Sequence, residues 1–81
     1  MRARIVWFGE AEHVFFELPV KDREEILAKL ELLQYFPRMY QVISRGRFRR
    51  HRKFCAGDWL VYYRVVENTV YIRGLWPARI P

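Results

Sequence analysis

The 81-residue sequence contains a single cysteine and no run of 18 apolar residues. One cysteine excludes an intramolecular disulfide framework, and a lone thiol is typical of a reducing compartment. The lack of a long apolar run argues against a membrane span and a signal peptide, so we expect a cytoplasmic protein without membrane contact. Only 4 glycines and 4 prolines accompany 52% hydrophobic residues, which excludes a disordered chain. The length predicts one domain over residues 1–81.

Motifs for most kinds of catalysis are also absent. The sequence has no glycine-rich phosphate-binding loop, no Gly-x-Ser-x-Gly motif and no obvious cluster of carboxylates for magnesium. Its two histidines and one cysteine lack ligand spacing, so we expect neither a metal site nor a cofactor. Metal-free RNA cleavage is compatible with the arginine, lysine, histidine, aspartate and tyrosine side chains that remain. The RNA 2′-hydroxyl is itself the nucleophile, so the protein need only align it, move protons and stabilise charge.

Positive charge is concentrated in one segment. The net charge is +6, and residues 45–53 (RGRFRRHRK) hold six cations and no acid, while the rest of the chain is nearly neutral. Clustered like charges repel one another, and a polyanion offsets that repulsion. The segment therefore predicts a nucleic-acid surface formed by Arg45, Arg47, Arg49, Arg50, Arg52 and Lys53. Two alternatives to nucleic-acid binding are an acidic protein partner and a solvated edge strand that its charge protects from aggregation.

The first half of the sequence predicts a strand followed by two helices. A β-branched and aromatic run predicts a strand over residues 3–8, and acidic residues followed by apolar ones predict a short helix over residues 10–17. Apolar residues at three- and four-residue spacing predict a longer helix over residues 20–35. The stripe that this helix would bury against a sheet consists of Val20, Ile26, Leu27, Leu30 and Leu33.

The second half predicts three antiparallel strands, over residues 47–54, 59–66 and 69–76, separated by short turns. Both faces of the middle run are largely apolar, which is typical of a central strand. Alternation in the first run predicts a wholly basic strand face, formed by Arg47, Arg49, His51 and Lys53. The whole pattern predicts an α+β fold, with an N-terminal strand and a helical hairpin packed on a small antiparallel sheet.

Several further residues have both a functional and a structural interpretation. His51 is a candidate general base because flanking cations favour the neutral imidazole, although a histidine in a basic run is more often an ordinary surface residue. Asp58-Trp59 is either a turn followed by a core tryptophan or part of a site. Trp76 either packs in the core or offers a platform for base stacking. Arg73 and Arg79, on and after the last strand, would lie near the cationic strand in an antiparallel meander.

The sequence resembles the RelE/ParE superfamily of bacterial and archaeal toxins. The segments GDWLVYYRV and NTVYIRGLWPAR are similar to the family's hairpin and closing strand, and LPVKDREEILAKLELLQYFP is similar to its second helix. The Asp58-Trp59 pair is similar to the YafQ-like branch. The resemblance covers nearly the whole chain and implies a β-α-α-β-β-β fold.

The resemblance implies a metal-independent endoribonuclease that cuts mRNA on the ribosome and so inhibits translation. Lys53 matches a family position occupied by a catalytic lysine or histidine, and His51 is its close neighbour. One of these two side chains would move the 2′-hydroxyl proton, while Asp58 and Trp59 orient the site or stack on a base. The scissile phosphate would be held by Arg49, Arg50, Arg73 and Arg79.

Departures from the family pattern favour an alternative. A family arginine that contacts phosphate is Leu60 here, a family histidine is Trp76, and the chain ends at Pro81, before the aromatic tail of some members. The alternative is a ParE-like poison of DNA gyrase, which needs no catalytic residues; an inactive binding module is a third possibility. Either toxin implies a cognate antitoxin whose acidic, amphipathic segment covers the basic face.

Overall fold

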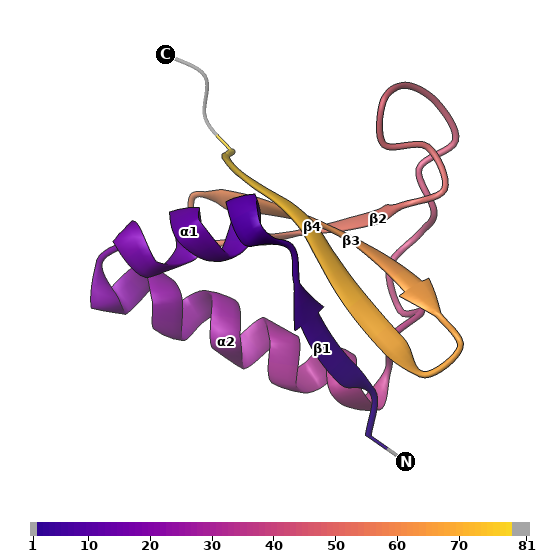
Figure 1. Ribbon diagram of the computed structural model, residues 1–81, viewed down its shortest axis with the longest axis horizontal. Helices are drawn as coiled ribbons and strands as arrows, with labels where there is room; N and C mark the ends of the chain where they lie inside the picture. Colours follow the sequence, from indigo (N-terminus) through magenta and orange to yellow (C-terminus); the bar gives the residue numbers. More distant parts are fainter. Residues whose placement is uncertain (1, 79–81) are drawn as a thin grey trace.

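The computed structural model describes residues 2–78. In chain order these residues form β1 (Arg4–Trp7), α1 (Gly9–Glu17), α2 (Val20–Tyr35), β2 (Arg52–Ala56), β3 (Trp59–Val66) and β4 (Thr69–Pro77) (Figure 1). The predicted α+β fold and its β-α-α-β-β-β order are confirmed. Within the described part of the chain, no helix is both long enough and apolar enough to cross a membrane.

The strands form one mixed sheet in the order β1-β4-β3-β2. The pairs β2–β3 and β3–β4 are antiparallel, as predicted, and β3 is an inner strand. The sequence pattern made no prediction for the pairing of β1, which joins the edge of the sheet parallel to β4. Parallel neighbours need a long connection, and the chain between β1 and β4 passes through both helices and the other two strands.

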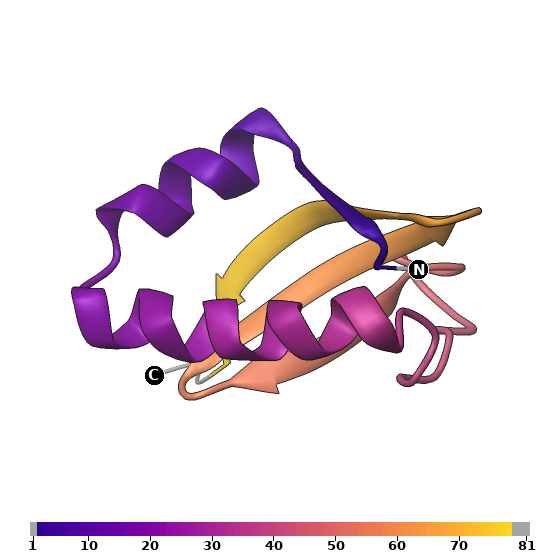
Figure 2. The same ribbon diagram turned by 90° about the horizontal axis from the view of Figure 1, so that it is seen from below.

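The hydrophobic core lies between α2 and one face of the sheet, and α1 packs near β4 (Figures 1 and 2). From α2, Ile26 and Leu33 are fully buried, and they pack in one cluster with Val61, Tyr63 and Ile72 of the sheet. We call this side of the sheet the helix face. Because side chains alternate along a strand, the residues between these positions point to the opposite side, which we call the open face.

The buried stripe on α2 is narrower than the sequence pattern predicted. Ile26, Leu30 and Leu33 are buried, but Leu27 is 49% exposed and Val20 is 58% exposed. Successive residues of a helix are rotated by roughly 100°, so Leu27 points well away from the line through its buried neighbours. A stripe that includes Leu27 is therefore wrong for this helix, and α2 keeps an apolar outer surface.

The predicted strand over residues 47–54 is wrong for most of its length. Residues 43–51 form a loop instead, and β2 begins only at Arg52 (Figure 1). Residues 46 and 50 have positive φ angles of 86° and 71°, which lie outside the extended region that strands require. The predicted basic strand face is therefore absent, and the arginines before Arg52 project from the loop.

The loop is closed by its own backbone. The amide of Ile43 donates to the carbonyl of His51 at 2.7 Å, and the amide of Arg50 donates back to the carbonyl of Ile43 at 2.8 Å. Further turns within the loop join Arg49 to Gly46 and His51 to Phe48. These bonds replace the ladder that an edge strand would have made with β3.

Buried Tyr63 joins the sheet to the segment that leads into this loop. Its hydroxyl donates to the carbonyl of Pro37 at 3.1 Å, and the guanidinium of Arg52 donates to the carbonyls of Tyr40 and Arg38. Backbone carbonyls in an irregular segment need such partners when they approach the core. The contacts hold residues 37–40 against the start of β2.

We expect the stability of the protein to fall at high pH because of Tyr63. Burial raises the pKa of Tyr63 from 10.0 to about 12, so the folded state favours the neutral phenol. This contribution is complete below pH 10 and is lost as the pH rises toward about 12, at most about 2–3 kcal/mol of unfolding free energy. Urea unfolding across this range should show the loss in the parent and in Tyr62→Phe, whereas Tyr63→Phe should lack it. Equal pH dependence in all three proteins would contradict the assignment.

Candidate functional site

Aromatic side chains hold the loop 43–51 on the open face of the sheet. Phe48 of the loop stacks on Tyr62 of β3, with ring centroids 4.4 Å apart and planes at 21°. Trp76 of β4 meets both rings edge to face, at 5.1 Å from Phe48 and 5.4 Å from Tyr62. We call Phe48, Tyr62 and Trp76 the aromatic cluster. It brings the arginine-bearing loop next to the last strand.

Gly74 gives the indole of Trp76 its place beside β4. A Cβ atom at this position would lie 1.8 Å from the nearest atom of the indole ring, so any other residue would displace the ring. Gly74 is paired with Tyr62 on β3, which is itself a member of the aromatic cluster. The glycine therefore allows one aromatic ring to cover the backbone between two strands.

An irregularity in β4 places Arg73 on the edge of the same region. Tyr62 pairs with Gly74 and Tyr63 pairs with Ile72, which leaves Arg73 as an extra residue in β4. Such a bulge changes the direction of a side chain relative to the regular alternation. The guanidinium carbon of Arg73 lies 4.0 Å from the ring centroid of Phe8, which follows β1. This cation–π contact joins the last strand to the N-terminal one.

These elements enclose an open cleft of about 420 Å³. Its lining comes from the start of α1, the loop 43–51 and β4, so it combines three distant parts of the sequence. Two guanidinium groups, one carboxylate, one imidazole and three aromatic rings share it. We call this site the cleft; it is lined by Phe8, Gly9, Glu10, Arg47, Phe48, His51, Arg73 and Trp76.

One ring nitrogen of His51 forms a hydrogen bond, and the other has no hydrogen-bond partner among the described residues. Its Nδ1 lies 3.2 Å from the carbonyl oxygen of Arg49, and because a carbonyl only accepts, Nδ1 must carry the proton. In the neutral ring, Nε2 is then an acceptor. Nε2 is buried and has no hydrogen-bond partner among the described residues. Buried polar atoms without partners are rare and destabilising, which makes this nitrogen a candidate for substrate contact. Because Nε2 is buried, the ring of His51 has to turn before this nitrogen reaches a ligand in the cleft.

The structure brings some of the predicted site residues together. Arg47, His51 and Arg73 all line the cleft. Lys53 is paired with Tyr62 and so shares the open face, but it lines a neighbouring groove beside residues 40–44. The other loop arginines, Arg45, Arg49 and Arg50, are exposed.

Other predicted residues lie elsewhere. The indole of Trp59 donates to the carboxylate of Asp22 on α2 at 3.2 Å, so Trp59 belongs to the helix face. Asp58 is in the turn between β2 and β3, where its carbonyl accepts from the amide of Ala78 at 2.7 Å. The guanidinium of Arg52 is occupied by backbone carbonyls, as described above. Arg79 lies outside the described residues.

Sequence reasoning missed Phe8 and Glu10 as members of the cleft. They come from the N-terminal part of the chain, and only the parallel pairing of β1 with β4 brings them beside Arg73. The amide of Phe8 donates to the carbonyl of Ile72 at 3.0 Å, which continues this pairing. Neither residue belongs to a motif, so no signal in the sequence alone would have connected them to the basic loop.

We expect Gly74→Ala to displace Trp76 without unfolding the protein. The new methyl group would occupy the position of the indole, and because Trp76 is 39% exposed, its ring can rotate toward solvent. The tryptophan emission should then shift to longer wavelength, and affinity for an RNA ligand should fall several-fold because one stacking surface is lost. Gly9→Ala is the control for the emission shift, since a Cβ atom there would meet nothing within 4 Å. Unchanged emission in Gly74→Ala would contradict the packing described here.

Comparison with known proteins identifies the fold. No protein-family model and no curated protein matches the sequence. The isolated Escherichia coli RelE toxin superimposes with a TM-score of 0.82 at 15% identity, over 98% of this chain and 87% of that one. RelE in the intact E. coli RelBE toxin–antitoxin complex gives 0.80 at 15% identity, over 96% and 99%. The archaeal RelE–RelB complex from Pyrococcus horikoshii OT3 gives 0.75 at 21% identity, over 96% and 97%. The fold expected from the sequence resemblance is therefore confirmed, and this chain has the RelE toxin fold.

Proposed function

We propose that this protein is the toxin of a toxin–antitoxin system and that it cuts mRNA bound to the ribosome. The observation that carries the proposal is the cleft, which joins two guanidinium groups, an unpartnered imidazole nitrogen and aromatic walls. Guanidinium groups bind phosphates, and aromatic rings stack on unpaired bases. The combination suits single-stranded RNA, and action on ribosomes would place the protein in the cytoplasm.

The proposed reaction is attack of an RNA 2′-hydroxyl on the adjacent phosphorus. Nε2 of His51 takes the hydroxyl proton as the bond from the 2′-oxygen to phosphorus forms and the bond to the 5′-oxygen breaks. The leaving 5′-oxygen takes a proton from water or from a cation of the site, so the products are a 2′,3′-cyclic phosphate and a 5′-hydroxyl. Negative charge grows on the phosphoryl oxygens, and Arg47 and Arg73 are the cations of the cleft that would stabilise it.

Lys53 and the exposed loop arginines extend this positive surface beyond the cleft. Lys53 of β2 lies on the open face beside Tyr62 of β3, and β3 separates it from Gly74 and Trp76 of β4. A lysine there would contact the RNA backbone next to the cut or supply the second proton transfer. Arg49 and Arg50 are exposed on the loop 43–51 and would contact neighbouring phosphates.

A cognate antitoxin is the second proposed partner. Two of the similar structures are complexes of RelE proteins with RelB proteins. In this chain, α2 exposes Leu27, Leu32 and Tyr35 at 49%, 41% and 57%, and the adjacent Phe36 at 60%. An acidic, amphipathic segment would cover these apolar side chains and neutralise the arginine loop at once.

Toeprinting on programmed ribosomes tests the nuclease proposal. The purified protein should cut mRNA inside the A-site codon, and Lys53→Ala should reduce cutting at least tenfold because a cation of the open face is lost. Lys29→Ala is the matched control, since Lys29 is an exposed lysine on α2. Intact mRNA in the presence of the parent protein would refute the nuclease.

One observation favours the alternative of a protein-binding gyrase poison. Leu60 is paired with Trp76, so an apolar side chain occupies the open face where an arginine would serve a nuclease. An apolar and aromatic surface of this kind suits protein contact. Growth arrest with DNA damage and with intact mRNA would favour this activity over RNA cleavage.

A further inference from the structure

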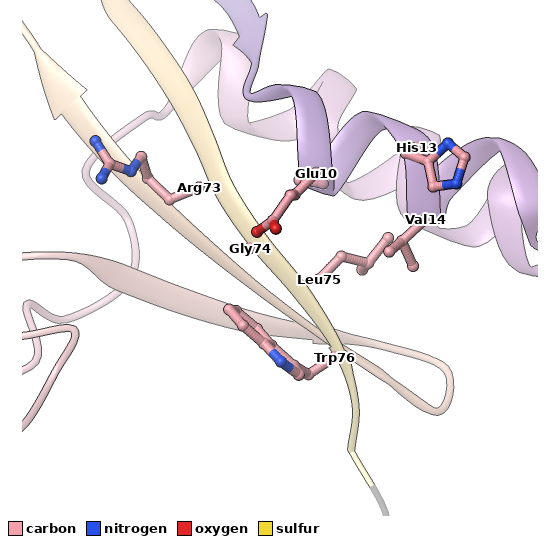
Figure 3. Close-up of a pocket in the computed structure, with 8 residues that line it drawn as sticks. Glu10, His13, Val14, Arg73, Gly74, Leu75 and Trp76 are labelled. Atoms are coloured by element: carbon pink, nitrogen blue, oxygen red, sulfur yellow. The ribbon is translucent and has the colours of Figure 1, made fainter.

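The cleft contains a carboxylate that phosphate binding does not explain. Glu10, in the first turn of α1, lines it together with Arg47 and Arg73. Figure 3 shows the neighbouring pocket between α1 and β4, into which Glu10 reaches from α1 toward Gly74. Among residues 2–78, Glu10 forms no ion pair with either arginine. Its acceptor oxygens are therefore available to a ligand.

The cleft is lined by charges of both signs, Glu10 on one hand and Arg47 and Arg73 on the other. A carboxylate repels phosphate, so an RNA backbone would be drawn to the arginine side and kept away from Glu10. The part of a nucleotide that a carboxylate attracts is the base, whose N–H groups donate hydrogen bonds. The ring of Phe48 is stacked on Tyr62, but Trp76 also lines the cleft, and base–aromatic stacking on its indole would hold the base there.

The hydrogen-bonding pattern of a carboxylate selects among the four RNA bases. Its two oxygens match two adjacent donors, and guanine presents such a pair, N1–H and the N2 amino group. Adenine and cytosine each present one amino group beside a ring nitrogen that accepts, and uracil presents one N–H between two carbonyls. Each of these three bases sets an acceptor against the carboxylate, which is unfavourable.

We propose that the cleft binds a guanine base and that Glu10 is the residue that determines this specificity. The inference rests on the proposed RNA function and adds a base preference to it. The volume of about 420 Å³ lies within the usual range for small-ligand sites, which run from roughly 300 to 1,000 Å³. Glu10 acts here by binding the base and takes no part in the proton transfers.

Binding of short, uncleavable RNA tests the proposal without any need for catalysis. The probes are 2′-O-methyl pentauridine and the same oligomer with a central guanine, adenine or cytosine, each measured by fluorescence anisotropy at one fixed salt concentration. We expect the guanine oligomer to bind about tenfold more tightly than the others, the effect of one good bidentate contact. Glu10→Gln should lose this preference, because an amide offers one acceptor and one donor group.

Glu12→Gln is the matched control. Glu12 is an exposed residue of the same first turn, and its carboxylate lines neither the cleft nor the neighbouring pocket. The substitution Glu12→Gln therefore removes an equal charge at a different place. Any general gain in RNA affinity should appear in both variants, whereas the guanine preference should be lost only in Glu10→Gln. Equal binding of all four oligomers by the parent protein would overturn the proposal, and so would an unchanged preference in Glu10→Gln.

The result is separable from that of the toeprinting experiment. Cleavage on the ribosome together with equal affinity for all four oligomers would refute guanine selection and leave the nuclease in place. A guanine preference that depends on Glu10, with intact mRNA on the ribosome, would support the base site and refute the nuclease.

Discussion

His51→Ala should reduce ribosome-dependent mRNA cleavage by about 10²–10⁴-fold, the range typical for loss of a general acid or base. The expectation follows from the two ring nitrogens, since Nδ1 is held by the carbonyl of Arg49 and Nε2 has no partner among the described residues. Removing the imidazole takes away the proposed proton acceptor of the cleft, while Arg47 and Arg73 remain to bind the RNA. Affinity for the uncleavable oligomers should change little compared with the loss in rate.

His13→Ala is the matched control for this experiment. His13 is exposed on α1, and its Nε2 lies 3.1 Å from the carboxylate of Glu17 one turn later. Exposed pairs of this kind contribute little to stability, and His13 does not line the cleft. His13→Ala should therefore cleave like the parent protein. If His51→Ala also cleaves at the parent rate, the proton acceptor is another group, and Lys53 is the next candidate.

Leu33→Ala should destabilise the protein by about 2–5 kcal/mol, a large share of the roughly 5–15 kcal/mol available to a small domain. Leu33 is fully buried between α2 and the sheet, so its truncation leaves a cavity under the strands that carry Tyr62 and Trp76. Urea unfolding followed by circular dichroism measures the effect as a lower midpoint with an unchanged slope.

The neighbouring Leu32 provides the control. It precedes Leu33 on the same helix but is 41% exposed, so Leu32→Ala removes a side chain of equal size mainly from the surface. We expect a change below about 1 kcal/mol. Equal destabilisation by the two substitutions would mean that α2 is rotated relative to the orientation described here.

The elements with strong local patterns were predictable from the sequence. The helix over residues 20–35 and the strand over residues 59–66 have the predicted bounds, because prolines flank the helix and short turns flank the strand. The basic run was not predictable in the same way. Alternating arginines satisfy a strand pattern, but positive φ angles at Gly46 and Arg50 and the backbone bonds to Ile43 make it a loop.

The residues of the candidate site were also only partly predictable from the sequence. Arg47, His51 and Arg73 could be selected from charge and chemistry alone, whereas Trp59 appeared equally suitable until its indole was found on the helix face beside Asp22. For an isolated aromatic residue, the sequence cannot distinguish one face of a strand from the other when both faces are apolar. That choice depends on which face α2 covers.

By itself the sequence determined an α+β chain with a basic segment before its hairpin, because helix and strand periods and local charge are properties of neighbouring residues. Only the tertiary structure decided which residues meet in the cleft. Phe8 and Glu10 lie more than 60 positions before Arg73 and Trp76, and they reach them because β1 pairs parallel to β4 and a bulge redirects the strand at Arg73. Contacts of this kind depend on the packing of the whole chain, and no local pattern encodes them.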